Sequence, residues 1–300
     1  MIQNDNWSDN QMDNRINNQI NNKINNKINN QIHNQINNQV NNQVNDQVNN
    51  QINDQINDQI NNRIDNEPLL LRRIALIHTD FPEKFGIPRQ SGIVDSLKAQ
   101  IIFEPEFRNA DALRGLEGFS HIWLIWGFLD TGRDTWSPMV KPPRLGGNKR
   151  MGVFATRSPF RPNPLGLSSV ELEGIELGTE QGPVLHVSGA DLMDGTPIYD
   201  IKPYLPYTDS HPEALGGFAD PLKEYALQVE FPEHLLKLIP AQHHEALLGV
   251  LAHDPRPSYH NDPERKYGFG YAGFNIRFTV QDSLIKVCEV TPYDEYKETL

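Results

Sequence analysis

Apolar residues follow two different rhythms along the chain, and the change between them falls at Pro68. From residue 14 to 64 an Asn-rich tetrapeptide repeats, with Ile or Val at every fourth position from Ile16 to Ile64. On a helix a period of four advances about 40° per repeat, so the apolar stripe winds around the axis instead of forming one face. Residues 1–67 are therefore expected to be a low-complexity tail, either disordered or a single long helix, with a β-assembly as the weaker alternative.

After Pro68 the apolar residues gather in short runs separated by turns rich in Gly and Pro. The run at 119–128 is almost continuously apolar, as expected of a strand buried on both faces. Apart from 109–116 there is little helix between the runs, so the βαβ rhythm of a doubly wound sheet is missing. We predict a mainly β domain, a sandwich or a barrel, over 68–210. Its strands are expected at 69–77, 99–103, 119–128, 152–155, 167–173 and 184–188.

The remaining residues, 211–300, are expected to form a small α+β domain. A helix is predicted at 232–252. Alternating patterns predict strands at 274–280 and 284–290. The second strand contains the single cysteine of the chain, Cys288, which we expect in the core.

Two short motifs in this region resemble functional signatures but lie in the wrong context. Residues 268–273 match the dinucleotide fingerprint G-x-G-x-x-G, yet they lead into a strand pattern where phosphate binding requires the start of a helix. His243-His244-Glu245 lacks the second histidine that a zinc protease carries four residues after the first, so it is interpreted as a surface feature. We expect neither a nucleotide site nor a metal site here.

The composition excludes several classes of protein. The chain carries 27 basic and 39 acidic residues, a net charge of −12, which argues against indiscriminate binding of nucleic acid. One cysteine cannot support an intrachain disulfide framework or a zinc ribbon. Because no run of about 18 apolar residues occurs, we expect no membrane span and a cytoplasmic protein.

One stretch departs from the acidic balance of the chain. No acidic residue lies between Asp134 and Glu171, whereas this interval contains six basic residues. They are Lys141, Arg144, Lys149, Arg150, Arg157 and Arg161. Such a stretch is either a solvated loop whose counter-charges come from elsewhere in the fold or a binding surface for phosphate or another polyanion, and the composition favours the second.

A second dense stretch, 188–204, combines three aspartates, a lysine and two tyrosines with turn residues. Asp194-Gly195 followed by Thr-Pro is typical of a tight turn, and capping of that turn is one explanation of the aspartates. Asp200, Lys202 and Tyr204 alternate, so on a strand they would share one face. An ionisable face of that kind favours a functional site.

Five segments of the chain resemble the TsaA-like family of tRNA (adenine-N6)-methyltransferases. They are PRQSG at 88–92, LEGFSHIWLIWGF at 116–128, VKPPRLGGNKRMGVFATRSPFRPNPLGLSSVEL at 140–172, DLMDGTPIYDIKPYLPYTD at 191–209 and PRPSYHNDPERKYGFGYAGFNIRF at 255–278. Motifs of this length are specific, and they cover 69–209 strongly and part of the C-terminal region. The tetrapeptide tract lies outside the resemblance.

The resemblance implies a β-barrel methyltransferase that works as a homodimer, with S-adenosylmethionine at or near the subunit interface. Its implied substrate is N6-threonylcarbamoyladenosine beside the anticodon of threonine tRNA, and the anticodon arm would meet the basic stretch 141–161. The guanidinium of Arg157 would suit the carboxylate of the cofactor, because it can hold that group with two hydrogen bonds. Carried over residue by residue, the cofactor contacts fall on Gln90, Ser91, Gly92, Leu129, Asp130, Arg157, Leu167, Ser188, Gly189, Ala190 and Asp191.

Methylation requires the N6 atom of the substrate to lose a proton, so a general base is expected. Asp194 is the first candidate, with Asp200 or Tyr204 as alternatives, and Lys202 would hold negative charge on the substrate. Asp191 or Asp194 could compensate the ammonium group of the cofactor or bind its ribose. Two other interpretations stay open: an RNA-binding barrel without catalysis, and a methyltransferase of the same fold with another substrate.

Overall fold

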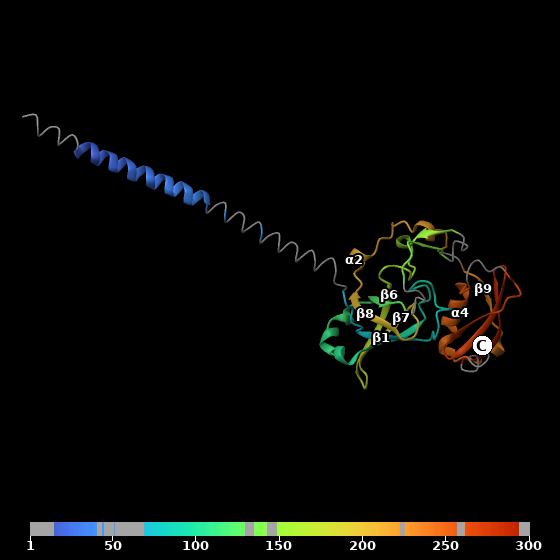
Figure 1. The fold of residues 1–300 in the computed structure, drawn as a ribbon. Coiled ribbons are helices and arrows are strands. Elements are labelled where there is room, and N and C mark those ends of the chain that lie inside the picture. Colours follow the sequence, from blue (N-terminus) through green and yellow to red (C-terminus); the bar gives the residue numbers. More distant parts are fainter. Residues whose placement is uncertain are drawn as a thin grey trace, which may run out of the picture. The chain divides into compact units, whose positions relative to one another are not determined.

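The computed structural model describes residues 15–40, 44, 51, 69–129, 135–142, 149–222, 226–256 and 262–293. The chain divides into two compact units, Met1–Leu70 and Leu71–Leu300. In the first unit, residues 15–40 form one α-helix, drawn in blue in Figure 1. Its Ile and Val side chains are all about half exposed, and a period of four rotates each about 40° from the one before, so they do not form a single apolar face. No helix in the described part of the chain is long and apolar enough to cross a membrane.

The second unit is built around a closed barrel of six antiparallel strands (Figure 1). In barrel order the strands are β1 (Ala75–Thr79), β2 (Lys98–Phe103), β7 (Gly182–Ser188), β6 (Leu165–Thr179), β3 (His121–Gly127) and β8 (Thr196–Pro203). Pairing of β1 with β8, with Ala75 opposite Ile198, closes the ring. The prediction of a mainly β fold with a barrel is confirmed.

Alternating apolar side chains fill the barrel. In β3 the side chains of Ile122, Leu124 and Trp126 are buried, whereas Trp123 and Ile125 between them are partly exposed. The expectation that this strand is buried on both faces is therefore wrong. One face of β3 points into the barrel and the other lies on its outside, which is the normal arrangement in a small closed sheet.

Three short 3-10 turns connect β2 to β3, in place of the helix predicted at 109–116. They are η1 (Pro105–Phe107), η2 (Ala110–Leu113) and η3 (Leu116–Gly118). Gly115 lies between the last two turns with a φ of 89°, a left-handed conformation that ends a helix and that glycine adopts without strain. This single residue explains why the helical pattern does not continue.

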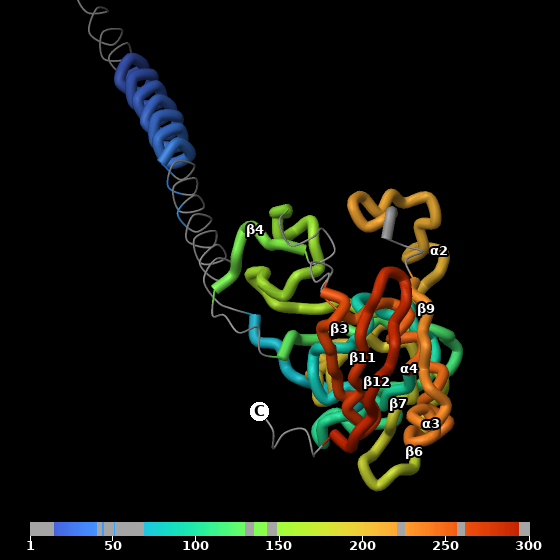
Figure 2. Tube along the Cα trace, turned by 90° about the vertical axis from the view of Figure 1, so that its right-hand side faces the viewer, coloured from blue at the N-terminus to red at the C-terminus, as the bar shows by residue number. Residues whose placement is uncertain are grey.

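Two predicted strands have different limits in the structure. The first strand begins at Ala75 and not at residue 69, because its partners in β2 and β8 begin to pair with it there. The strand predicted at 152–155 ends at Gly152, where a 3-10 turn, η5 (Val153–Ala155), begins. Two short strands, β4 (Met139–Val140) and β5 (Met151–Gly152), pair to form an arm that extends from the barrel in Figure 2.

The C-terminal part of the second unit is a four-stranded sheet covered by short helices. The strands, in sheet order, are β10 (Tyr267–Tyr271), β11 (Phe274–Gln281), β12 (Leu284–Pro292) and β9 (Gln228–Glu230), and the last pairs parallel to β12. The helices that pack on this sheet are α3 (Glu233–Leu236) and α4 (His244–Ala252), with η7 (Ala241–His243) between them. Earlier in the chain, α2 (Pro206–Asp209) follows β8 and η6 (Gly217–Leu222) precedes β9. Figure 2 shows β11 and β12 in red beside α4.

Two expectations for this region are wrong. The helix predicted at 232–252 is broken at Pro240, which separates α3 from η7 because proline lacks an N–H donor and clashes with a preceding turn. Cys288 is exposed, because the inward positions of β12 around it are Ile285 and Val287. A register shift opposite Cys288, between Arg277 and Phe278 of β11, changes the alternation at that point.

The second unit has two apolar cores that share one segment of chain. One core fills the barrel, and the other lies between the C-terminal sheet and α4. Phe81, Val94 and Leu97 belong to the second core, although they lie between barrel strands β1 and β2 in the sequence. A Cβ on Gly249 of α4 would lie 2.8 Å from Val94, so glycine lets the helix pack closely on this segment.

Candidate active site

Two loops meet where β7 leaves the barrel and β8 enters it. The N–H of Gly92 donates to the carbonyl of Gly189, and the N–H of Gly189 donates to the carbonyl of Leu97, each at 2.9 Å. Gly189 has a φ of 75°, and a Cβ there would lie 3.3 Å from the backbone nitrogen of Gly92. These two predicted cofactor residues are therefore side by side, and the absence of side chains allows the contact.

Asp191 is the partly buried carboxylate of this region. The hydroxyl of Ser168 donates to Oδ1 of Asp191 at 2.6 Å, and Nε1 of Trp126 donates to the same hydroxyl at 3.0 Å. Burial raises the pKa of the Asp191 carboxyl, while the hydrogen bond from Ser168 and the charge of Arg157 oppose that rise. A partly buried carboxylate is stabilised by a nearby cation, which suits a binding role.

A cavity of about 270 Å³ lies beside Asp191. Its wall is mainly apolar and includes Leu129 and the rings of Trp126 and Phe128, whose centroids are 4.5 Å apart. Arg157 is close enough to act on the charge of Asp191. A partly buried acid, a guanidinium and an aromatic wall fit the chemistry of S-adenosylmethionine, which carries an ammonium, a sulfonium, a carboxylate and an adenine ring.

The other residues predicted in the two loops have different surroundings. The guanidinium of Arg157 donates to Oε1 of Gln90, which ties the arm to the 88–92 loop. The backbone of Ser91 hydrogen-bonds to Asp191. Ser188 and Ala190 are buried, and the hydroxyl of Ser188 is directed to Glu171 of β6 at 3.3 Å. Ser188 and Ala190 therefore anchor the loop that follows β7 through buried side chains.

Leu167 is one of several predicted cofactor residues that do not line this cavity. It precedes Ser168 in β6, so its side chain points to the opposite face of the sheet, where it is 55 % exposed. Leu129 lines the cavity as expected. Asp130 lies outside the described residues.

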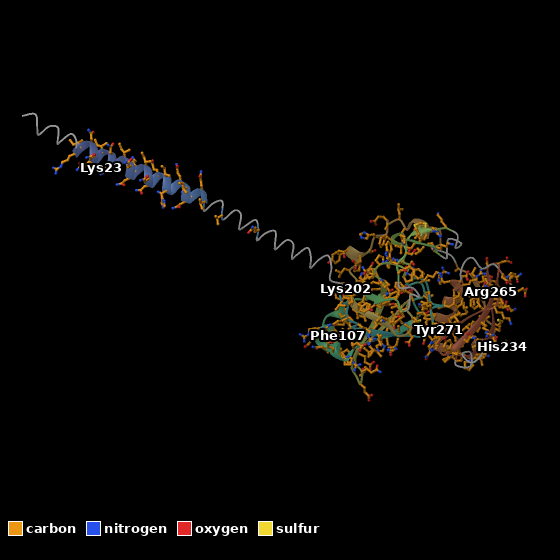
Figure 3. The ribbon with its side chains drawn as sticks, in the orientation of Figure 1. Lys23, Phe107, Lys202, His234, Arg265 and Tyr271 are labelled. Atoms are coloured by element: carbon orange, nitrogen blue, oxygen red, sulfur yellow. The ribbon has the colours of Figure 1, made fainter. Side chains whose placement is uncertain are left out.

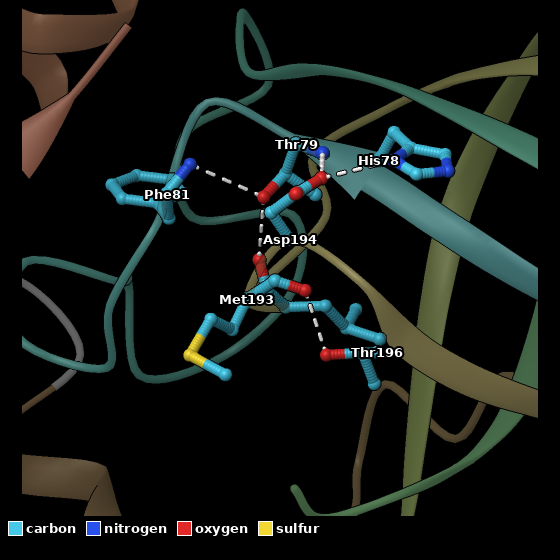
Figure 4. Close-up of polar contacts among 7 residues, drawn as sticks. His78, Thr79, Phe81, Met193, Asp194 and Thr196 are labelled. Carbon is cyan, nitrogen blue, oxygen red and sulfur yellow. Dashed lines mark hydrogen bonds and ion pairs between the residues drawn. The ribbon is translucent and has the colours of Figure 1, made fainter. Parts of the chain in front are cut away.

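Asp194 lies in a tight turn at the same end of the barrel (Figure 4). Its Oδ1 accepts a hydrogen bond from the N–H of Thr79 at 3.1 Å and lies 3.1 Å from Nδ1 of His78. Gly195 follows with a φ of 75°, as expected from the Asp-Gly turn pattern. The side chain of Asp194 remains about half exposed, so this carboxylate, paired with an imidazole, is accessible to a substrate.

Lys202 and Tyr204 lie at the opposite end of β8 from Asp194. The strand begins at Thr196, and six residues at about 3.3 Å each place Lys202 roughly 20 Å further along. Figure 3 shows Lys202 on the side of the unit away from Tyr271 of the C-terminal sheet. Within one chain, Lys202 and Tyr204 therefore do not meet the Asp194 turn, and a joint role of the three residues stays a prediction.

The far end of β8 has its own set of contacts. Nζ of Lys202 lies 2.8 Å from Oδ2 of Asp200, as expected for residues on one face of a strand. The ring of Tyr204 lies 5.5 Å from that of Trp123, whose Nε1 donates to Asp209 at 2.8 Å. This bond and the N–H of Leu205 lower the pKa of the Asp209 carboxyl, with the backbone donor the larger cause. The ionisable side chains on this face of β8 therefore have partners among their own neighbours.

Several residues of the site were not found in the sequence. Trp126 and Ser168 lie inside apolar runs, where nothing distinguishes them from core residues. His78 follows a strand without a recognisable motif. His243 was interpreted as a surface feature, yet its ring is largely buried, and Nδ1 lies 3.0 Å from Oδ2 of Asp80. Among the described residues, no three His, Cys, Asp or Glu side chains are grouped as metal ligands.

The chain was compared with known proteins. The family model for the tRNA-methyltransferase O N-terminal domain matches residues 76–210, and the model for the TrmO C-terminal domain matches residues 224–293. The tRNA (adenine(37)-N6)-methyltransferase of Escherichia coli is 42 % identical over 228 residues, which cover 73 % of this chain and 97 % of that protein. A putative S-adenosylmethionine-dependent methyltransferase of Pseudomonas aeruginosa is 39 % identical over 232 residues, 74 % of this chain and 97 % of the relative.

A solved structure agrees with these matches. The crystal structure of TrmO from Pseudomonas aeruginosa aligns with a TM-score of 0.59 and 33 % sequence identity, covering 75 % of this chain and all of that one. The resemblance inferred from the PRQSG loop, the basic stretch and the aspartate-rich turn is confirmed. The chain belongs to the tRNA-methyltransferase O family.

Proposed function

We propose that the protein transfers a methyl group from S-adenosylmethionine to N6 of N6-threonylcarbamoyladenosine beside the anticodon of threonine tRNA. Membership of the tRNA-methyltransferase O family and the 42 % identity to a tRNA (adenine(37)-N6)-methyltransferase support the reaction. The observation that carries the proposal is the partly buried Asp191, which is held by Ser168, feels the charge of Arg157 and lines an apolar cavity. An RNA-binding module without catalysis would have no use for an acid in the wall of an apolar cavity.

The residues around the cavity would bind and orient the cofactor. S-adenosylmethionine, when bound, supplies an electrophilic methyl group on a positively charged sulfur. Arg157 would hold its carboxylate, since a guanidinium can donate two parallel hydrogen bonds to that group. Asp191 would balance the ammonium or accept hydrogen bonds from the ribose, and Trp126 and Phe128 would cover the apolar side. Orientation of this kind can lower a transfer barrier by about 7–11 kcal/mol.

Asp194 would act as the general base. In the transfer, the bond from carbon to sulfur breaks, the bond from carbon to N6 forms, and the N6 proton passes to a carboxylate oxygen of Asp194. His78 and the N–H of Thr79 hold that carboxylate in place in the free protein. Lys202, Tyr204 and Asp200 lie further along the same chain, in or just after β8, and the proposal does not assign them this proton transfer.

We also propose that tRNA binds along the arm that carries the basic stretch 141–161. Lys141, Lys149 and Arg150 are exposed, and the arm lines a large groove that also includes Arg89 and Arg157. Arg161 is directed instead to the carbonyls of Thr156 and Ser158, so it supports the arm. Arg144 lies outside the described residues.

A homodimer in the cytoplasm is part of the same proposal. Exposed apolar side chains gather on and near the arm, among them Phe154, Trp136 and Met139, and Leu167 is exposed on the barrel. A second copy would cover apolar surface of this kind. The chain would be organised as a tail (1–67), a catalytic barrel domain (68–210) and a C-terminal domain (211–300).

The function is tested with purified protein, S-adenosylmethionine labelled on its methyl group and two forms of threonine tRNA. One form carries the threonylcarbamoyl group on the adenosine and the other lacks it. We expect label in the first form alone, recovered as the N6-methylated threonylcarbamoyl nucleoside by mass spectrometry. Equal labelling of both forms would contradict the substrate assignment, and labelling of neither would contradict the activity.

A further inference from the structure

The segment 79–83, which begins with the last residue of β1, lies between the Asp194 turn and the C-terminal sheet. It is short, and its residues contact both neighbours through backbone and side-chain atoms. Phe81 at its centre is 1 % exposed and belongs to the C-terminal core. Because the segment is held on both sides, a shift of the C-terminal sheet would also move the Asp194 turn.

On the side of the active site, this segment holds the Asp194 turn at three points (Figure 4). The N–H of Thr79 donates to Oδ1 of Asp194, and the N–H of Asp194 donates to the carbonyl of Phe81 at 2.8 Å. The hydroxyl of Thr79 donates to the carbonyl of Leu192 at 3.1 Å and accepts from the N–H of Phe81 at 3.2 Å. The carboxylate of Asp194 therefore has the orientation that residues 79–81 give it.

On the other side, the C-terminal part holds the same residues. Nδ1 of His243 lies 3.0 Å from Oδ2 of Asp80, and the carbonyl of Asp80 accepts the N–H of Ala272 at 2.9 Å. The hydroxyl of Tyr271 donates to the Asp80 carboxylate, and its ring lies 5.2 Å from that of Phe81. The rings of His243 and Tyr271 meet edge to face at 5.9 Å.

A further bond ties the end of the segment to the same sheet. The N–H of Gly270, next to Tyr271 in β10, donates to Oε1 of Glu83 at 2.8 Å. A Cβ on Gly270 would lie 2.7 Å from Pro82, so the close approach requires glycine at this position. The contact is therefore built into the sequence of the strand.

We propose that His243 and Tyr271 are positioning residues, which act through Asp80 to hold Asp194 in the orientation needed to accept the substrate proton. The inference rests on the proposed function and adds to it a task for the C-terminal part. His243 touches neither the cavity beside Asp191 nor Asp194 itself. Its effect on catalysis passes through Asp80, which it contacts, and through the neighbouring Thr79, which donates to Asp194.

Physical chemistry gives the direction of the effect. Burial raises the pKa of the Asp80 carboxyl, and the nearby charge of Asp194 adds to that rise, whereas His243 and Tyr271 counter it. Without His243, Asp80 would be a partly buried acid with one partner fewer and a second carboxylate close by. The residues around Asp80 would then shift to reach water, and the Asp194 carboxylate would lose its fixed direction.

The first test compares three variants of the full chain in the methyl transfer assay. His243→Ala removes the partner of Asp80, and His243→Asn restores a donor close to the place of Nδ1. His234→Ala, in the exposed helix α3 of the same C-terminal part, is the control. We expect His243→Ala to lower kcat by about 10- to 100-fold with little change in KM for tRNA or cofactor, because displacement of about 1 Å can cost that much.

His243→Asn is expected to recover most of the rate, and His234→Ala to keep it. A purely structural role for His243 would instead lower the folding midpoint and change kcat and both KM values together. That pattern, or an unchanged kcat in His243→Ala, would overturn the inference. An inactive wild-type protein would instead overturn the proposed function.

The second test links His243 to Asp194 directly. In a double-mutant cycle, His243→Ala should lower the rate in the wild type but have no further effect in Asp194→Asn. Both changes remove the same function, the acceptance of the substrate proton by a correctly oriented Asp194 carboxylate. Independent, additive losses would contradict the inference.

Amide exchange gives a readout without catalysis. The Asp194 N–H, bonded to Phe81, should exchange about tenfold faster in His243→Ala, while that of Leu124 in β3 should not change. Unchanged exchange at Asp194 would show that His243 does not hold the turn, and would overturn the inference whatever the activity.

Discussion

Asp191 is expected to destabilise the fold at neutral pH, and the effect should be measurable. Burial raises the pKa of its carboxyl above the ordinary value of 3.8, so the folded state keeps this proton to a higher pH than the unfolded state does. The folded state then binds more protons over that interval, and stability falls as the pH rises through it. The carboxylate is kept in a place where it lowers stability, as expected of a group that binds a cation.

We predict that Asp191→Asn will be as stable as the wild type at low pH and more stable as the pH rises through the raised pKa. Asparagine is neutral and can still accept the hydrogen bond from Ser168. Unfolding midpoints measured between about pH 4 and 8 check this. Glu180→Gln, in an exposed turn, is the control and should leave the pH profile unchanged.

Binding should change in the opposite direction. Calorimetry with S-adenosylmethionine is expected to show weaker binding to Asp191→Asn than to the wild type, because the cation loses its counter-charge. A variant that is less stable at neutral pH, or that binds the cofactor as well as the wild type, would contradict the role given to Asp191.

At the scale of elements, alternation and turn residues predicted most strands, and single residues decided the failures. The strands at 99–103, 184–188 and 274–280 lie within β2, β7 and β11. Both helices that were predicted too long end at one residue, Gly115 or Pro240, whose local preference outweighs the apolar pattern. Those two signals were present in the sequence.

The active site shows a different limit of sequence reasoning. Long motifs placed Gln90, Arg157 and Asp191 in one region, which the contacts between the loop and the arm agree with. The alternation of residues along β8 indicated which side chains share a face of the strand. It could not indicate that, within one chain, Lys202 lies far along the strand from Asp194. The pairing of Asp80 with His243 joins residues 163 positions apart, and no local pattern reports such a contact.

The pairing of β3 with β6 places Trp126 against a glycine. Gly166 lies opposite Trp126 in the register, and a Cβ there would lie 2.2 Å from the indole ring. The indole ring cannot move away without breaking its hydrogen bond to the hydroxyl of Ser168. That hydroxyl in turn donates to Asp191. We predict that Gly166→Ala lowers stability by about 1–3 kcal/mol and weakens cofactor binding.

Chemical denaturation and calorimetry check both parts of this prediction. Gly178→Ala is the matched control, because it lies in the same strand and a Cβ there meets no atom within 4 Å. We expect it to leave stability and binding unchanged. If Gly166→Ala were stable and bound the cofactor normally, the ring of Trp126 would not be fixed as described.

At the scale of the whole molecule, the arm is basic although the chain as a whole is acidic. The chain carries a net charge of −12, yet the arm presents exposed Lys141, Lys149 and Arg150. Acidic surface elsewhere repels a polyanion, so tRNA would approach the arm in preference to other faces. The energy of such binding comes largely from release of counterions and therefore depends on salt.

We predict that replacing Lys149 and Arg150 together by glutamine weakens tRNA binding and flattens its dependence on salt. Each phosphate contact contributes about 0.7 to 0.9 to the slope of log K against log salt concentration, so two lost contacts should reduce the slope by about 1.5. Filter binding at several salt concentrations measures it. Lys23 and Lys27, exposed on the helix at 15–40, replaced in the same way, form the control with an equal change of charge. Since the proposal assigns tRNA to the arm, an equal loss of slope in the control would mean that total charge, and not the arm, governs binding.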